Sequence, residues 1–276
     1  MAVFLSLITS VLYGSGDFLG GLSSRRNTQT QVLITVSLAG TVPLLCVAPL
    51  FTSSFTAKDL LLGALAGIFG AGGLGIFSRG LARGPMSLVA PLTATTSAGV
   101  PVIWDLSKGQ QPGFICGVGI LLAFVAIFTA SRGQPNHGSS ISTSAILEAL
   151  LAGIGFGLFF CVLSETSTGS APWPIVAGRT SAAVVLLASA AVRKVSIKPT
   201  GSWLTLLGCS ICDTGANVAF LFALRYGQLG PVAVLASLYP AVTVLLARFA
   251  LGENLDRRRV AGLLITLMAI ILVAWG

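Results

Sequence analysis

Long apolar runs follow one another along almost the whole chain and are separated by short polar or turn-rich segments. Each run holds about 18 to 23 residues, the length with which an α-helix crosses the hydrocarbon core of a membrane. The pattern predicts an all-α integral membrane protein with ten transmembrane helices. Their predicted ranges are 2–21, 31–50, 60–78, 86–104, 113–130, 144–163, 173–192, 202–224, 231–250 and 260–275.

The longest polar break separates five of these helices from the other five. Residues 132–143 read RGQPNHGSSIST, in which Gly, Pro and Ser are typical of a linker. The sequence thus predicts a first unit over residues 1–131, the linker over residues 132–143 and a second unit over residues 144–276.

The two units repeat one another at an offset of 143 residues. The matching pairs are Tyr13-Gly14 with Phe156-Gly157, Phe77 with Phe220, Val89-Ala90 with Val232-Ala233, and Gly109 with Gly252. Because each unit holds an odd number of helices, the second enters the membrane upside down relative to the first. Two inverted five-helix repeats are the plan of many secondary transporters, whose substrate sites lie near the membrane midplane.

Composition agrees with this fold class and excludes others. Of 276 residues, 54% are hydrophobic and 9% are charged, and the mean hydropathy is +0.93, unlike a soluble globular domain. The 16 Lys and Arg are scattered between apolar runs and form no basic face, so we expect membrane lipid and no nucleic acid as a partner. The pattern carries no signal for an oligomeric state.

Positive charge favours one set of predicted loops. Twelve Lys and Arg lie on one side, whereas Lys58, Lys108 and Arg225 lie on the other. The positive-inside rule places the larger set in the cytoplasm and both termini outside, with the cell membrane as the expected location.

The helix predicted at 202–224 carries one formal charge, Asp213, near its centre. An ionisable group at bilayer mid-depth costs about 2.5 to 3.5 kcal/mol, so Asp213 is expected to face protein or water. Asn217 follows one turn later and shares that face. We expect both to line a transport pathway, with Asp213 as the candidate for proton or cation coupling.

Two further charges lie within predicted helices. The donors of Arg179 either grip a substrate carboxylate or serve structurally, by pairing with a carboxylate of a neighbouring helix or by reaching the headgroups. Asp17, in a glycine-rich stretch, either lies on the pathway or pairs with Arg25 or Arg26.

Polar and aromatic residues complete the candidate site. Polar residues and a proline occur together in both the fourth and the ninth predicted helices, where Thr96 and Tyr239 are expected to line the pathway. Bonding between helices is the alternative for the hydroxyls. The predicted substrate-binding or coupling residues are Asp213, Asn217, Arg179, Asp17, Tyr13, Phe156, Tyr239 and Thr96.

Three motifs suggest other functions but fit them poorly. The GxGxxG at residues 70–75 lies in an apolar helical run, where it predicts helix packing rather than a dinucleotide site. Cys209 and Cys212 spell CxxC without further ligands at metal-binding spacing, so no metal and no cofactor is expected. The sequence has no GxSxG and no histidine in a predicted helix, which argues against an enzyme. The near absence of long soluble loops argues against a scaffold.

Taken in order, these motifs resemble the EamA family of the drug/metabolite transporter superfamily over essentially the whole length. The residues that carry the resemblance are Tyr13-Gly14, Phe156-Gly157, Arg179, the turn from Ala223-Leu224-Arg225 to Pro231, and Leu251-Gly252-Glu253. The first half departs from the pattern, with Val36 in place of Arg179 and Gln110 in place of Glu253. The resemblance implies a carrier for small metabolites, amino acids or drugs, often an exporter driven by the proton gradient.

The sequence therefore predicts a secondary transporter that moves an amino acid or similar polar solute by alternating access, in proton-coupled export. Efflux of cationic or lipophilic drugs is the alternative, in which Tyr13, Phe156 and Tyr239 would hold the cation.

Overall fold

The computed structural model describes residues 1–24, 26–51, 54–84, 86–131, 143–192, 194–201, 203–251 and 257–275. Within these ranges the regular structure is helical and no strand occurs. The helices are α1 (Ala2–Ser23), α2 (Gln29–Val47), the 3₁₀-helix η1 (Ala48–Leu50), α3 (Ala57–Arg83), α4 (Met86–Ser107), α5 (Phe114–Ser131), α6 (Thr143–Ser164), α7 (Trp173–Val192), α8 (Trp203–Ala223), α9 (Leu229–Ala236), α10 (Tyr239–Leu251) and α11 (Arg257–Trp275). Residues 132–142 of the predicted linker lie outside the described residues, as does Glu253.

Seven helical segments of the described chain are long and apolar enough to cross a membrane. They comprise α1, α2 with η1, α3, α6, α7, α8, and α9 with α10. The apolar helices Phe114–Ile127 and Val260–Trp275, within α5 and α11, are shorter. The protein is thus an all-helical, multi-pass membrane protein.

Side-chain caps explain where two of these helices begin. At α2, the Thr28 side chain accepts a hydrogen bond from the Gln31 N–H, and Gln31 bonds back to Thr28. Thr56 and Asp59 form the same capping box at α3. Asp59 also accepts from the N–H of Ser167, at 2.7 Å, which ties the start of α3 to the segment after α6. α3 therefore starts three residues before its predicted range of 60–78.

The ninth predicted helix, 231–250, is broken into α9 and α10 at Ser237 and Leu238. Pro240 has no N–H, so the carbonyl group four residues earlier loses its helical donor. The N–H of Ala241 donates instead to the carbonyl of Leu238, three residues back, at 3.0 Å. Counting apolar residues does not detect such a break, because both segments are apolar.

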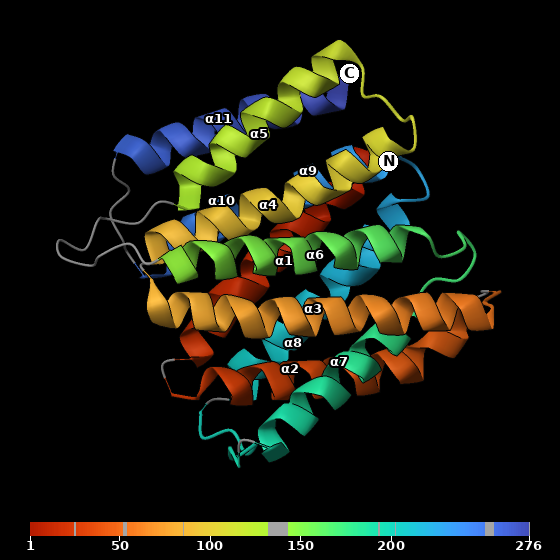
Figure 1. The fold of residues 1–276 in the computed structure, drawn as a ribbon, viewed down its shortest axis with the longest axis vertical. Coiled ribbons are helices and arrows are strands. Elements are labelled where there is room, and N and C mark those ends of the chain that lie inside the picture. Colours follow the sequence, from red (N-terminus) through yellow and green to blue (C-terminus); the bar gives the residue numbers. More distant parts are fainter. Residues whose placement is uncertain are drawn as a thin grey trace.

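Figure 1 shows α5 beside α11 at one edge of the molecule and α2 beside α7 at the opposite edge. Between these edges, α1 packs on α8, α3 packs on α6 and α7, and α6 packs on α4. α9 and α10 contact α1. The middle of the molecule is therefore enclosed by helices from both halves of the chain.

Glycines bring α3 and α7 into direct backbone contact. A Cβ atom added at Gly63 would lie 2.2 Å from the carbonyl oxygen of Pro174, and one added at Gly67 would lie 2.0 Å from that of Gly178. A side chain at either position would force the helices apart. Gly63 and Gly67 of α3 thus act in helix packing.

Candidate functional site

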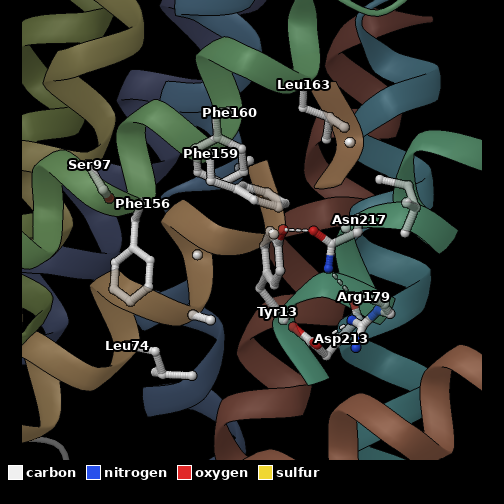
Figure 2. A pocket seen from close by; sticks show the side chains of 18 of the residues that line it. Tyr13, Leu74, Ser97, Phe156, Phe159, Phe160, Leu163, Arg179, Asp213 and Asn217 are labelled. Carbon is white, nitrogen blue, oxygen red and sulfur yellow. Dashed lines mark hydrogen bonds and ion pairs between the residues drawn. The ribbon is translucent and has the colours of Figure 1, made fainter. Parts of the chain in front are cut away.

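A cavity of about 270 Å³ lies among these central helices, and Figure 2 shows its labelled side chains. It is bordered by residues of α1, α3, α4, α6, α7, α8, α9 and α10 and by Ser237 at the helix break. Seven of the eight predicted site residues line it: Tyr13, Asp17, Phe156, Arg179, Asp213, Asn217 and Tyr239. The sequence separates them by up to 226 positions, and the fold brings them around one space.

Thr96 does not line the cavity. Its hydroxyl donates to the carbonyl of Leu92 within α4, at 2.8 Å, and its Cβ lies against Gly153 of α6. Ser97, the next residue, lines the cavity instead. Successive helical residues are about 100° apart, so a shift of one position exchanges the cavity face for the α6 face.

The charged end of the cavity is built on an ion pair between α7 and α8. Arg179 Nη2 pairs with Asp213 Oδ2. The Arg179 side chain is 9% exposed and that of Asp213 is 37% exposed, so the carboxylate faces the cavity more than the guanidinium does. Of the two alternatives predicted for Arg179, pairing with a neighbouring carboxylate is present. Its Nε atom is buried and has no hydrogen-bond partner among the described residues, which leaves one donor unused.

A hydrogen-bonded chain joins this pair to α1. Asn217 Nδ2 donates to the backbone carbonyl of Asp213, at 2.6 Å, and the Tyr13 hydroxyl donates to Asn217 Oδ1, at 2.9 Å. Figure 2 shows Tyr13 between the charged and the aromatic parts of the cavity. The Tyr13 ring meets Tyr239 and Phe160 edge-on, at centroid distances of 6.2 and 6.4 Å. Asn217 thereby links Tyr13 of α1 to α8, the helix that carries Asp213.

Asp17 lies one helical turn beyond Tyr13 on the same face of α1 and is exposed into the cavity. The structure describes no hydrogen bond or ion pair from its carboxylate to any of the residues it covers. The predicted alternative of pairing with Arg26 is therefore absent, and Arg25 lies outside the described residues. Asp17 is a second carboxylate in the cavity, and none of the described Lys or Arg side chains pairs with it.

Aromatic and aliphatic side chains form the other wall. Phe159 and Phe160 lie beside Phe156 on α6, and Leu74 faces them from α3 (Figure 2). Sequence reasoning missed Phe159, Phe160 and Leu74. Their only signal is the spacing of Phe156 and Phe159, which places two aromatic rings on one helical face.

Ser237 brings a further polar group to the cavity. It is 2% exposed, lines the cavity at the break between α9 and α10, and its hydroxyl has no partner among the described residues. A buried hydroxyl without a partner costs about 1–3 kcal/mol. Such a group is available to a bound solute.

Polar contacts close one end of the molecule, which we call the Lys108 face. It holds the C-terminal ends of α4 and α6 and the N-terminal ends of α3 and α9. Asp105 accepts a hydrogen bond from the N–H of Gly230 in α9, at 2.5 Å, and Lys108 pairs with Glu165. Trp104 Nε1 also donates to Glu165, at 3.2 Å. The hydrogen bond from Lys108 holds the pKa of Glu165 below its usual range.

Burial changes along two of the helices. In α9, next to the Lys108 face, every residue except Pro231 is buried. In α10, beyond the break, Ala241 alone is buried among the residues from Tyr239 to Ala250. α7 shows the same gradient, because Arg179 and most residues before it are buried whereas most of the later ones are not. α9 and the start of α7 are therefore packed more tightly than α10 and the rest of α7.

Five free cysteines are present, and no group of three or more potential metal ligands occurs in the ranges that the structure describes. Cys209 packs against α1, where its thiol donates to the carbonyl of Gly16, at 3.2 Å.

Comparison with known proteins gives two findings. The sequence model of the EamA-like transporter family matches residues 143–275. A solved structure described as "Crystal structure of protein" superposes with a TM-score of 0.79, over 99% of this chain and 96% of that chain, at 13% identity. At that identity the likeness shows the fold alone, and it extends over the first half of this chain as well. No curated protein matches the sequence at a significant level.

Proposed function

Because the chain belongs, through residues 143–275, to the EamA-like transporter family, we propose that it is a secondary transporter for a small metabolite. It works by alternating access across the cytoplasmic membrane. The observation that carries the proposal is the cavity, which is enclosed by both halves of the chain and combines a charged end with an aromatic wall.

The proposed architecture is ten transmembrane helices in two inverted five-helix repeats, residues 1–131 and 144–276, joined by the linker at 132–143. The helix contacts support it, because exchanging the two halves converts the contact of α1 with α8 into that of α6 with α3. The same exchange maps the contact of α5 with α11, and that of α2 with α7, onto itself.

Glycine contacts support the repeat at atomic detail. A Cβ at Gly14 of α1 would lie 2.6 Å from Val242 Cβ in α10. A Cβ at Gly157 of α6 would lie 2.5 Å from Val100 Cβ in α4. Corresponding glycines thus let corresponding helices approach one another.

The proposed substrate is an amino acid or a similar solute with a charged end and an apolar body. The free Nε of Arg179 suits a carboxylate, and the carboxylates of Asp213 and Asp17 suit an ammonium group. Phe156 and Phe159 offer apolar surface to the body. A volume of about 270 Å³ suits a solute of this size.

Efflux of cationic, lipophilic compounds is the second candidate. It is favoured by one observation, the aromatic lining beside the unpaired carboxylate of Asp17. The buried guanidinium of Arg179 opposes a site for cations alone.

The orientation of the charges supports export. If the arginine-rich loops are cytoplasmic, the Lys108 face is external. The tight packing of α9 there, compared with the more exposed α10, then fits a state closed to the outside, in which the cavity takes up solute from the cytoplasm.

Counterflow in proteoliposomes tests the proposal. Purified protein is loaded with L-phenylalanine, L-serine, D-glucose or choline, and exchange of the labelled solute is measured. We expect exchange of an amino acid, at least tenfold reduced by Arg179→Gln and unchanged by Thr96→Val, which alters a side chain outside the cavity. Exchange of choline alone would support the second candidate, and exchange of none of the four would contradict the proposal for these solutes.

A further inference from the structure

We propose that Asp17 takes up the coupling proton and that Asp213 is the fixed partner of Arg179. The inference rests on the proposed transport function and concerns the same cavity. It reverses the expectation from the sequence, in which Asp213 was the coupling candidate because it lies deepest in its helix.

The ion pair with Arg179 already occupies the Asp213 carboxylate. Arg179 is buried, and Asp213 is its one carboxylate partner among the described residues. Protonating Asp213 would leave the guanidinium without a counter-charge in a low-dielectric setting, which is strongly unfavourable. A proton that enters and leaves in every cycle therefore needs another acceptor.

The formal charges around the cavity indicate that this other acceptor is Asp17. The described residues that line the cavity carry three formal charges, positive on Arg179 and negative on Asp213 and Asp17. The cavity thus has a net charge of about −1 when all three are ionised. Closing it away from water with that charge unbalanced is costly, whereas one proton on Asp17 makes it neutral.

The described surroundings of Asp17 offer its carboxylate no counter-charge. Its charged and titratable neighbours are Asp213 and Cys209 of α8, Tyr239 of α10 and Tyr13 of its own helix. Among the described residues that line the cavity, Arg179 of α7 is the one cation, and it is paired with Asp213. No described neighbour therefore pairs with the Asp17 anion, and the nearby carboxylate of Asp213 repels it.

The position of Asp17 also allows protons to reach its carboxylate. Asp17 is exposed into the cavity, so its carboxylate exchanges protons with cavity water. Uptake forms one O–H bond from a hydrated proton, and release returns that proton to water on the other side after the cavity reopens. No other reactant is required.

Infrared difference spectroscopy of the purified protein in nanodiscs tests the assignment without a substrate. The wild type is expected to show a protonated-carboxyl C=O band that is lost as the pH rises. The band should be absent from Asp17→Asn, shifted in Asp17→Glu, and retained in Asp213→Asn and in the control Glu165→Gln. If Asp213→Asn does not fold, the Arg179→Gln, Asp213→Asn double variant replaces it. A band that survives Asp17→Asn, or a wild type without one, would overturn the proposal.

A transport assay provides the second test of the assignment. In proteoliposomes with a pH gradient, followed with L-phenylalanine and an internal pH dye, Asp17→Asn is expected to abolish gradient-driven accumulation and the accompanying proton flux. Asp17→Glu, which keeps an ionisable carboxyl group at this position, should retain part of both. Gradient-driven accumulation by Asp17→Asn would overturn the inference while leaving the transport function intact. Absence of wild-type exchange would instead count against the function, and the infrared result would still decide the assignment.

Discussion

The two walls of the cavity occupy matching positions in the two halves of the chain but differ in chemistry. Asp213 and Asn217 of α8 line the polar wall, and the residues 143 positions earlier are Gly70 and Leu74 of α3, which also line the cavity. Equivalent positions of the helix that packs on each of them show the same contrast. Asp17 of α1 corresponds in this way to Phe160 of α6.

This comparison distinguishes the backbone geometry of the cavity from its specificity for a solute. Under the proposed repeat, residues 143 positions apart lie at equivalent places of the two halves and so meet at one cavity. We expect the differences between the halves to determine what the cavity binds, because one wall carries charges and the other carries glycine, leucine and phenylalanine. A solute that is polar at one end and apolar at the other matches such a site.

The largest effect on stability and transport is expected when charge is removed from the polar wall. Asp213→Asn leaves Arg179 buried without a counter-charge, so we expect a loss of stability on the order of 3–5 kcal/mol and little folded protein. Arg179→Gln in the same chain should restore much of the fold but no transport. Fluorescence-detected size exclusion gives the folded fraction, and counterflow gives activity. A stable, active single variant would show that the pair is dispensable.

The second prediction concerns the matching glycines. Leucine at Gly157 would clash with Val100, and leucine at Gly14 would clash with Val242 and the carbonyl of Tyr239. We expect overpacking of about 1–3 kcal/mol and transport that falls more than the amount of inserted protein. Gly117→Leu, where an added Cβ meets nothing within 4 Å, is the control. Normal transport by both variants would mean that the glycine match has no continuing role.

A third change makes the apolar wall resemble the polar one. Leu74→Asn copies the residue found at the matching position, Asn217. It is expected to weaken exchange of L-phenylalanine about tenfold while affecting exchange of L-serine much less. Competition assays on the variant and on the Thr96→Val control measure the ratio. An unchanged ratio would show that Leu74 does not contact the solute body.

The smallest effect is expected at the Lys108 face, where Lys108 of the first half pairs with Glu165 of the second. Because the folded state lowers the pKa of Glu165 from 4.5, the pair stabilises the protein above that value and the contribution is lost as the pH falls. Both side chains are partly exposed, so the effect is small. Thermal unfolding of wild type and Glu165→Gln should differ slightly at pH 7, and the difference should shrink as the pH is lowered below 4.5. A difference that grows on acidification would contradict this assignment.

Much of the helix plan could be predicted from the sequence, because apolar length and polar breaks are direct consequences of the membrane. Helix ends were less predictable. α3 continues to Arg83, which pairs with Glu148 of α6, although its apolar run ends earlier. The break at Ser237 was missed because Pro240 alone does not reveal whether a helix kinks or separates into two.

The candidate site was predictable where charge was concerned. Burial of an ionisable group is costly, so Asp213 and Arg179 had to face inward, and the helical period put Asn217 on the same face. Phe160 and Leu74 could not be identified, because an apolar residue in an apolar run gives no contrast. That Arg179 pairs with Asp213 rather than with Asp17 depends on how α7 and α8 meet, which no single helix encodes.

The interruption at Ser237 and Leu238 divides the ninth predicted helix into two shorter helices, α9 and α10. Its α9 segment is fixed by burial and by the hydrogen bond from Gly230 to Asp105, whereas α10 is lightly packed. Because Pro240 has no N–H, the helical hydrogen bond that it would donate is already absent. It does not have to be broken when the chain bends between α9 and α10. A bend at Ser237 and Leu238 would therefore move α10, with Tyr239 of the cavity lining, relative to α9 without the loss of a further hydrogen bond at Pro240.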